Sequence, residues 1–187
     1  MKLPSPAVLG TILAGSELLL SLGKRSGQRA VSKDRGSLWL IWGVYALVIP
    51  LGIFATYHLR SCRIPWPETV QLAGLGLYLL GLAVRWYAIL YLGRFFTTNV
   101  AIAADQRVID TGPYRHVRHP SYAGGLLTLF GLCLTFDNWA SLLIIFLPAL
   151  AVNRWRIHVE EQALLEGLGE PYRAYCRRTK RLLPFIY

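Results

Sequence analysis

Charged side chains are scarce in this chain, and acidic ones are half as common as basic ones. Only 16% of the 187 residues are charged, with 10 Asp and Glu against 20 Lys and Arg, whereas 54% are hydrophobic. With a mean hydropathy of +0.40, this composition excludes an ordinary soluble domain. The alternating strands of about ten residues that build a membrane β-barrel are also missing. We therefore predict an all-α, multi-spanning membrane protein.

Several signatures of chemistry are missing as well. The three cysteines are Cys62, Cys133 and Cys176. Their scattered spacing predicts neither a disulfide nor a metal site. Gly74-Leu-Gly76 with Gly81 does not fit the dinucleotide fingerprint and lies in an apolar stretch, where small residues more often serve helix packing. Because no nucleophile motif or phosphate-binding loop is present either, a nucleotide-like cofactor would not be held by a soluble Rossmann domain.

Five apolar stretches are present, at residues 3–22, 38–59, 70–92, 121–136 and 139–152. A helix needs about 20 apolar residues to cross the hydrocarbon layer. The last two stretches are shorter, and Asp137-Asn138 between them leaves room only for a tight turn, so we expect a helical hairpin and five membrane helices. Residues 154–176 should form a cytosolic helical segment at the membrane surface, broken at Gly169-Glu170-Pro171. We expect one membrane domain over 1–187, with two N-terminal helices (1–67) and a core (68–187).

The basic residues are distributed unevenly among the connections. Five lie in 23–37, four in 93–120 and seven after 153, against one before the first helix and two in 60–67. The positive-inside rule then places the N-terminus outside and the C-terminus in the cytosol, in the inner membrane if the source is bacterial. Only Lys2 precedes the first stretch, so we expect an uncleaved helix. The net charge of +10 favours anionic lipid headgroups or an anionic ligand, and no nucleic-acid partner is expected.

The segment 112–122 brings polar residues to the start of the fourth stretch. Pro120 suits the first position of a helix and disfavours helix at His119 before it. Unpaired amides at this helix N-terminus, beside Arg118 and His119, form a seat for a carboxylate or a phosphate. The alternative is that Arg115 and Arg118 only anchor the helix to lipid headgroups.

Two further polar features lie inside or next to apolar stretches. Arg85 is about seven residues from the cytosolic end of the third stretch, where a charge costs about 2–3 kcal/mol and marks a functional site, unless its side chain snorkels to the interface. Glu160 and Glu161 follow the fifth stretch, close to Arg154 and Arg156. By itself this pair is also typical of an exposed helix surface.

Taken together, these pieces resemble a known family. The matching elements are 85–93, Thr111-Gly112-Pro113-Tyr114, Arg118-His119-Pro120-Ser121-Tyr122, Glu160-Glu161, Gly169-Glu170-Pro171-Tyr172 and Leu183-Pro184-Phe185-Ile186. The chain resembles the isoprenylcysteine carboxyl methyltransferases and their bacterial relatives over about residues 70–187. The combination of Arg-His-Pro-x-Tyr with a later Glu-Glu pair is the most specific part.

The resemblance implies a membrane enzyme that transfers a methyl group from S-adenosylmethionine to a lipid-like or lipidated acceptor, at the cytosolic face. It places the cofactor between the fourth and fifth helices and the C-terminal segment. The residues assigned to the cofactor site are Gly112, Tyr114, His119, Pro120, Tyr122, Glu160 and Glu161, to which the helix-terminus argument adds Arg118. Arg85 and Arg154 match family arginines that engage a substrate carboxylate, and Glu160 joins them as a candidate catalytic residue. His158-Val159 departs from the acidic run of the eukaryotic enzymes, so the division of work between the two glutamates stays open.

Alternatives differ in the chemistry they require. A carboxylate acceptor is ionised at neutral pH and needs an arginine but no general base, whereas an amine, as in a phospholipid amine N-methyltransferase, needs Glu160 or Glu161 as the base. The membrane sterol reductases, which use NADPH, share the Arg-His-Pro-x-Tyr element and a similar C-terminal pattern. A non-catalytic lipid-binding protein would use the basic cluster only to grip headgroups. The partners expected are membrane lipids and an amphiphilic or prenylated substrate; the sequence leaves the acceptor and the oligomeric state open.

Overall fold

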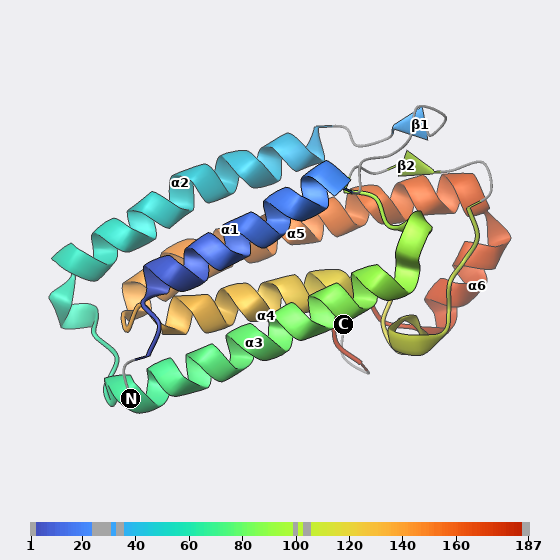
Figure 1. Ribbon diagram of the computed structural model, residues 1–187. Helices are drawn as coiled ribbons and strands as arrows, with labels where there is room; N and C mark the ends of the chain where they lie inside the picture. Colours follow the sequence, from blue (N-terminus) through green and yellow to red (C-terminus); the bar gives the residue numbers. More distant parts are fainter. Residues whose placement is uncertain (1–2, 24–30, 33–35, 99–100, 103–105, 185–187) are drawn as a thin grey trace.

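The helices form a bundle with the short C-terminal helix and two short strands at one end, which we call the capped end (Figure 1). The computed structural model describes residues 3–23, 31–32, 36–98, 101–102 and 106–184. The long elements are α1 (Pro6–Gly23), α2 (Ser37–His58), α3 (Pro67–Leu92), α4 (Pro120–Leu134), α5 (Trp139–Leu168) and α6 (Glu170–Arg178). The short ones are the 3₁₀ turns η1 (Arg60–Cys62), η2 (Gly93–Phe95) and η3 (Gly112–Arg115) and the antiparallel strands β1 (Val31–Ser32) and β2 (Ala101–Ile102). The all-α prediction is confirmed apart from this two-residue strand pair.

The number of helices that can cross a membrane differs from the prediction. Within the described ranges four helices, α1, α2, α3 and α5, are long and apolar enough. The fourth apolar stretch forms a helix too, but α4 has only 15 residues and a length of about 22 Å, less than the roughly 30 Å of the hydrocarbon layer. All five predicted apolar stretches therefore form helices, with α4 short as expected, whereas the other short stretch belongs to the 30-residue α5.

The predicted end of the fifth helix is wrong. α5 continues without interruption for 30 residues, to Leu168. Residues 154–168 are thus not a separate surface segment, because charged side chains do not interrupt the backbone ladder of a helix when they face a polar environment. The predicted break is confirmed: Gly169 has φ 62° and separates α5 from α6. Phe185 and Ile186 of the predicted C-terminal motif lie outside the described residues.

Consecutive long helices run in opposite directions, so α1, α3 and α5 end where α6, β1 and β2 lie (Figure 1). The connections on this side are those at 24–36 and 93–119 and the segment after 168, which contain most of the basic residues. The prediction that these connections share one side of the membrane agrees with this arrangement. The five basic residues of the first connection, Lys24, Arg25, Arg29, Lys33 and Arg35, lie outside the described residues.

Glycines let α3 and α4 touch backbone to backbone. A Cβ added at Gly81 would lie 2.4 Å from the amide nitrogen of Thr128, and one at Gly124 would lie 2.5 Å from that of Arg85. Two helical turns away, Gly74 and Gly131 meet in the same way. A Cβ added at either glycine would lie 2.8 Å or less from the carbonyl oxygen of the other. This seam confirms the packing role predicted for Gly74 and Gly81, whereas a Cβ at Gly76 would meet nothing within 4 Å, so the prediction is wrong for that residue. The seam fixes Arg85 against the first turn of α4.

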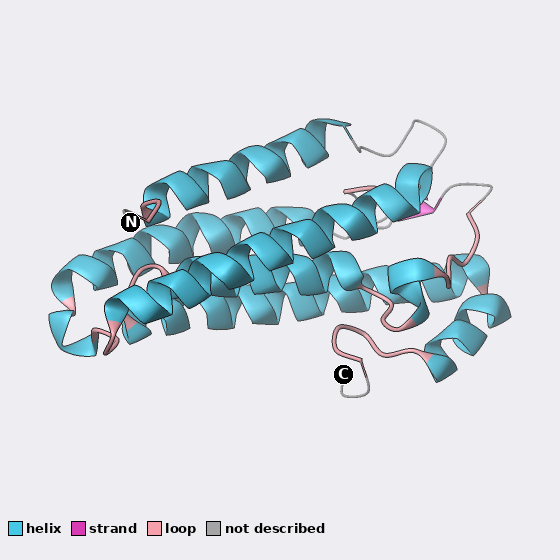
Figure 2. Cartoon of the chain, turned by 60° about the horizontal axis from the view of Figure 1, so that its bottom comes forward, coloured by secondary structure: helices cyan, strands magenta, loops and turns pink. Residues whose placement is uncertain are grey.

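Polar contacts join the remaining helices. Ser141 of α5 donates to the carbonyl oxygen of Gly52 in α2 (2.8 Å), and Asn153 donates to the Tyr45 hydroxyl (3.0 Å). α1 lies to one side of the other helices (Figure 2) and buries only Leu9, Ser16 and Leu20. α1 is therefore the least embedded of the long helices.

Candidate active site

A cavity of about 1010 Å³ runs inside the bundle, between α1 and α2 on one side and α3, α4 and α5 on the other. Much of its lining is apolar, including Leu13, Ile41, Ile49, Leu129 and Ile145. At the capped end, polar side chains replace the apolar ones: Glu17, Arg85, Tyr114, Arg118, His119, Tyr122, Arg156 and Glu160. The cavity thus joins an apolar chamber to a cluster of charges, the shape that an amphiphile with a polar head requires.

Arg85 enters this polar cluster from α3. Its Nη1 donates to the carbonyl oxygen of Ser121 in α4 (3.0 Å), and its Nη2 pairs with the Glu17 carboxylate of α1 (2.7 Å). Its Nε is buried without a hydrogen-bond partner among the described residues. The side chain is 14% exposed, so this arginine does not snorkel to the interface. Arg85 thus lines the cavity while one of its donors, covered by its neighbours, makes no hydrogen bond within the described ranges.

Arg156 enters the cluster from α5 and is buried (3% exposed). Its Nε donates to the Tyr122 hydroxyl (3.3 Å), its Nη1 to the Ser37 hydroxyl (2.6 Å), and its Nη2 to the carbonyl oxygen of Thr98. Tyr122 in turn donates to Oε2 of Glu160 (2.8 Å). Arg156 therefore ties α2, α4 and the segment after α3 together at the head of the cavity.

The two glutamates of the predicted pair have different surroundings. The His119 ring lies between them, with Nδ1 4.0 Å from Oε1 of Glu160 and Nε2 3.3 Å from Oε1 of Glu161. Glu160 lines the cavity and is 30% exposed, whereas the Glu161 side chain is 6% exposed and is not part of the lining. Glu160 is the carboxylate that can meet a ligand.

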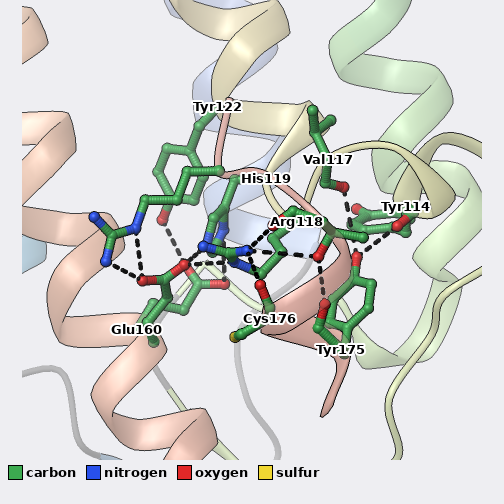
Figure 3. Close-up of polar contacts among 11 residues, drawn as sticks. Tyr114, Val117, Arg118, His119, Tyr122, Glu160, Tyr175 and Cys176 are labelled. Carbon is green, nitrogen blue, oxygen red and sulfur yellow. Dashed lines mark hydrogen bonds and ion pairs between the residues drawn. The ribbon is translucent and has the colours of Figure 1, made fainter. Parts of the chain in front are cut away.

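Glu161 anchors the C-terminal segment. It accepts from Arg118 Nε and Arg181 Nε, both at 2.8 Å. Arg118 also donates to the carbonyl oxygens of Cys176 and Thr179 (Figure 3). The backbone continues the contact, because the amide of Arg118 donates to the carbonyl oxygen of Lys180 (2.7 Å). The segment before α4 is thereby held against the chain that follows α6.

Two buried tyrosines complete the wall. The Tyr175 hydroxyl of α6 donates to the carbonyl oxygen of Tyr114 (2.6 Å), and the Tyr114 hydroxyl donates to that of Ala88 in α3 (3.2 Å), as Figure 3 shows for the first pair. Burial raises the pKa of both phenols above the usual 10.0. Both therefore remain protonated donors at any physiological pH.

The structure brings most of the predicted site residues together, in different roles. Those that line the cavity are Arg85, Tyr114, Arg118, His119, Tyr122 and Glu160. Gly112 and Pro120 act through the backbone: Gly112 has φ 56° and an added Cβ would lie 2.5 Å from the Tyr91 ring, and Pro120 is the first residue of α4. Arg154, predicted to engage the substrate, lies on the exposed side of α5 and does not line the cavity.

Sequence reasoning missed two residues of the cluster, Arg156 and Glu17. Arg156 had a detectable signal, since it follows Asn153 by three positions and precedes Glu160 by four, which continues one helical stripe toward the cavity. Arg154 lies off that stripe. Glu17 is the one acidic residue of α1, and its isolation in an apolar stretch was the signal for it.

Comparisons with known proteins agree on one family. The profile of the isoprenylcysteine carboxyl methyltransferase (ICMT) family matches residues 74–166. The protein-S-isoprenylcysteine O-methyltransferase of Schizosaccharomyces pombe is 30% identical over 118 residues, which cover 62% of this chain and 50% of the yeast protein. A probable protein-S-isoprenylcysteine O-methyltransferase of Oryza sativa subsp. indica is 31% identical over 182 residues, which cover 94% of this chain and 92% of the rice protein.

A solved structure has the same fold. It is that of the eukaryotic intramembrane Ras methyltransferase ICMT, with a TM-score of 0.64 and 27% sequence identity over 78% of this chain and 52% of the solved one. The chain thus spans about half the length of this enzyme and of the yeast relative, but nearly all of the rice relative. On these matches, the chain belongs to the isoprenylcysteine carboxyl methyltransferase family of integral membrane methyltransferases.

Proposed function

We propose that this protein transfers a methyl group from S-adenosylmethionine to the carboxylate of an isoprenylcysteine-type amphiphile. The observation that carries the proposal is the continuity of one cavity, from an apolar chamber among α1, α2, α4 and α5 to a head containing Arg85, Arg156, His119 and Glu160. An apolar tail and a charged head fit such a cavity in a single orientation.

The residues at the capped end fit the cofactor. Glu160, at the cavity surface, is a carboxylate acceptor for the cofactor's ammonium or ribose hydroxyls, and Tyr114 and Tyr122 supply aromatic walls. Bound there, S-adenosylmethionine supplies an electrophilic methyl group on a sulfonium. Arg118 and Glu161 keep the segment before α4 in place, so that His119 and Tyr122 stay in the lining. Closure of the C-terminal segment over this end limits the access of water.

Arg85 and Arg156 are the cations that we assign to the acceptor carboxylate. Both line the cavity, and the buried Nε of Arg85 has no hydrogen-bond partner in the part of the chain that the structure describes. A carboxylate with a pKa of about 4 is already the reactive form at pH 7, so the chain needs to aim it rather than to remove a proton. We therefore assign to Arg156 the part that the sequence suggested for Arg154.

The orientation in the membrane is part of the same proposal. The capped end collects the ends of α1, α3 and α5 and the connections rich in Lys and Arg, which favours the cytosolic side for the site and the outside for the N-terminus. In a bacterium the membrane would be the inner one. Membrane lipids would surround the exposed apolar faces of α1, α2 and α3, and an acceptor would diffuse to the cavity within the bilayer.

The experiment is methyl transfer by the protein in lipid nanodiscs. Tritiated S-adenosylmethionine is supplied with N-acetyl-S-farnesylcysteine, with the carboxamide of the same compound as the matched control, and with phosphatidylethanolamine. The proposal is supported if a base-labile tritiated methyl ester forms with the acid and no methylation occurs with the carboxamide or phosphatidylethanolamine. Methylation of phosphatidylethanolamine alone would replace it by amine methylation. Binding of S-adenosylhomocysteine and of NADPH is titrated separately. A protein that binds NADPH but not S-adenosylhomocysteine would be a reductase, and one that binds neither would be a non-catalytic lipid-binding protein.

A further inference from the structure

Glu17 is a carboxylate already seated on the arginine that we assign to the acceptor. It lies on α1, outside residues 74–166 that match the family profile. Its Oε2 is 2.7 Å from Nη2 of Arg85, and both side chains line the cavity. We propose that Glu17 determines specificity by competing with the acceptor's carboxylate for Arg85. This inference rests on the proposed function, because it presupposes a carboxylate acceptor.

The geometry of the pair leaves Arg85 incompletely used. A carboxylate that binds an arginine side-on takes both Nε and Nη2. Glu17 takes Nη2, while Nε is buried without a hydrogen-bond partner among the described residues. An acceptor carboxylate that binds side-on would satisfy the unused donor, but it needs the same Nη2 that Glu17 holds. The two carboxylates therefore exclude one another at this face of Arg85.

Charge leads to the same conclusion. Glu17 and Arg85 together are neutral, so while they are paired a second carboxylate at the head of the cavity is left with Arg156, whose guanidinium already donates to Tyr122, Ser37 and Thr98. A neutral head, such as an amide, meets no such obstacle. While Glu17 occupies Arg85, the site therefore accepts neutral heads more readily than anionic ones.

Glu17 is able to leave. Its side chain is 28% exposed, twice the fraction of Arg85. The next two residues, Leu18 and Leu19, are 56% and 66% exposed, so this part of α1 has a free side. The neighbouring contact of α1 is one hydrogen bond, from Trp86 Nε1 to the Ser16 hydroxyl (2.9 Å). Rotation of the Glu17 side chain away from Arg85 does not require the core of the bundle to open.

The experiment compares Glu17→Gln with wild type in nanodiscs, using N-acetyl-S-farnesylcysteine and its carboxamide as ligands. Affinities are measured by titration in the presence of S-adenosylhomocysteine, followed by steady-state kinetics with the acid. In the variant we expect the Kd of the acid to fall roughly tenfold, a typical size for the coupling between two ligands. The Kd of the carboxamide should stay within about twofold, because an uncharged head does not compete with Glu17 for the Arg85 cation. The KM of the acid should fall with its Kd, and by a larger factor than any change in kcat.

Two further variants separate this inference from a structural role of Glu17. Ser16→Ala removes the neighbouring tie of α1 without changing charge and should alter neither Kd, whereas Glu17→Asp should retain weak binding of the acid. If Glu17→Gln binds the acid no better than wild type, or if Ser16→Ala reproduces the gain, the competition does not exist. Failure of the proposed function has a different signature, namely no methyl ester from wild type on any acid.

Discussion

Replacing Gly81 by alanine tests whether the glycine seam between α3 and α4 positions the active site. The added Cβ would lie 2.4 Å from the amide nitrogen of Thr128 and 2.7 Å from the carbonyl oxygen of Gly124. Both atoms belong to the backbone of α4, so no side chain can turn aside to relieve the clash. The helices themselves must separate.

The size of the effect follows from these distances. Restoring an ordinary contact of 3.4 Å from 2.4 Å requires a local separation of about 1 Å, and such overpacking costs about 1–3 kcal/mol. Arg85 lies one helical turn further along α3, and its hydrogen bond to Ser121 of α4 is 3.0 Å long. A misplacement of about 1 Å in a positioning group lowers turnover by roughly 100-fold. We expect both effects in Gly81→Ala.

A matched control lies on the same helix. A Cβ at Gly76 meets nothing within 4 Å, so Gly76→Ala should be neutral or stabilise α3 by up to about 1 kcal/mol. The assay is thermal unfolding in detergent together with kcat/KM for methyl transfer in nanodiscs. If Gly81→Ala has the same unfolding temperature and the same kcat/KM as wild type, the helices are not in backbone contact and the reasoning fails. Equal losses in both variants would show a general intolerance of α3 to alanine.

The other predictions concern polar residues of the site. Arg156→Ala should lower kcat/KM for the acceptor by roughly 100-fold, the loss expected for a buried charge-assisted contact, whereas Arg154→Ala should change it by about twofold at most in the same assay. Glu160→Gln should weaken binding of S-adenosylhomocysteine in calorimetric titration about tenfold, the value of one charge-assisted hydrogen bond, with an unchanged Tm. Glu161→Gln should instead lower the free energy of unfolding by about 3 kcal/mol, because Arg118 and Arg181 lose their shared counter-ion.

Each of these predictions has an outcome that contradicts it. If kcat/KM falls more in Arg154→Ala than in Arg156→Ala, the acceptor carboxylate binds Arg154, as the sequence analysis predicted. If instead Glu160→Gln lowers Tm and Glu161→Gln lowers the affinity for S-adenosylhomocysteine, then Glu160 stabilises the fold and Glu161 binds the cofactor, the reverse of our assignment.

Features of the fold that depend on neighbours along the chain were predictable. Pro120 marks the start of α4 because its fixed φ suits a first helical turn. Gly169 with Pro171 predicts the break after α5 for an equally local reason, a left-handed residue followed by one that cannot continue a hydrogen-bonded ladder. The juxtaposition of His119 with the two glutamates was predicted only through resemblance to a family, since they are about forty residues apart.

Features that depend on what covers a helix were not predictable. The apolar pattern stops after Val152, but α5 continues because its last four turns face the capped end rather than lipid. Arg154 and Arg156 lie two residues apart, and although the stripe with Asn153 and Glu160 indicates the face of Arg156, its partners Ser37 in α2 and Tyr122 in α4 were not predictable. The sequence indicated that Arg85 lies deep in the membrane. It did not indicate its partner, because Glu17 is 68 residues away in α1.

The pairing of the segment before α4 with the chain after α6 has a consequence for biosynthesis. The amides of Arg118 and His119 donate to the carbonyl oxygens of Lys180 and Arg181. Because the chain is synthesised from its N-terminus, these carbonyls are the last partners of the segment before α4 to become available. We therefore expect the capped end to close only once these bonds form, and chains truncated before residue 180 should not retain S-adenosylhomocysteine.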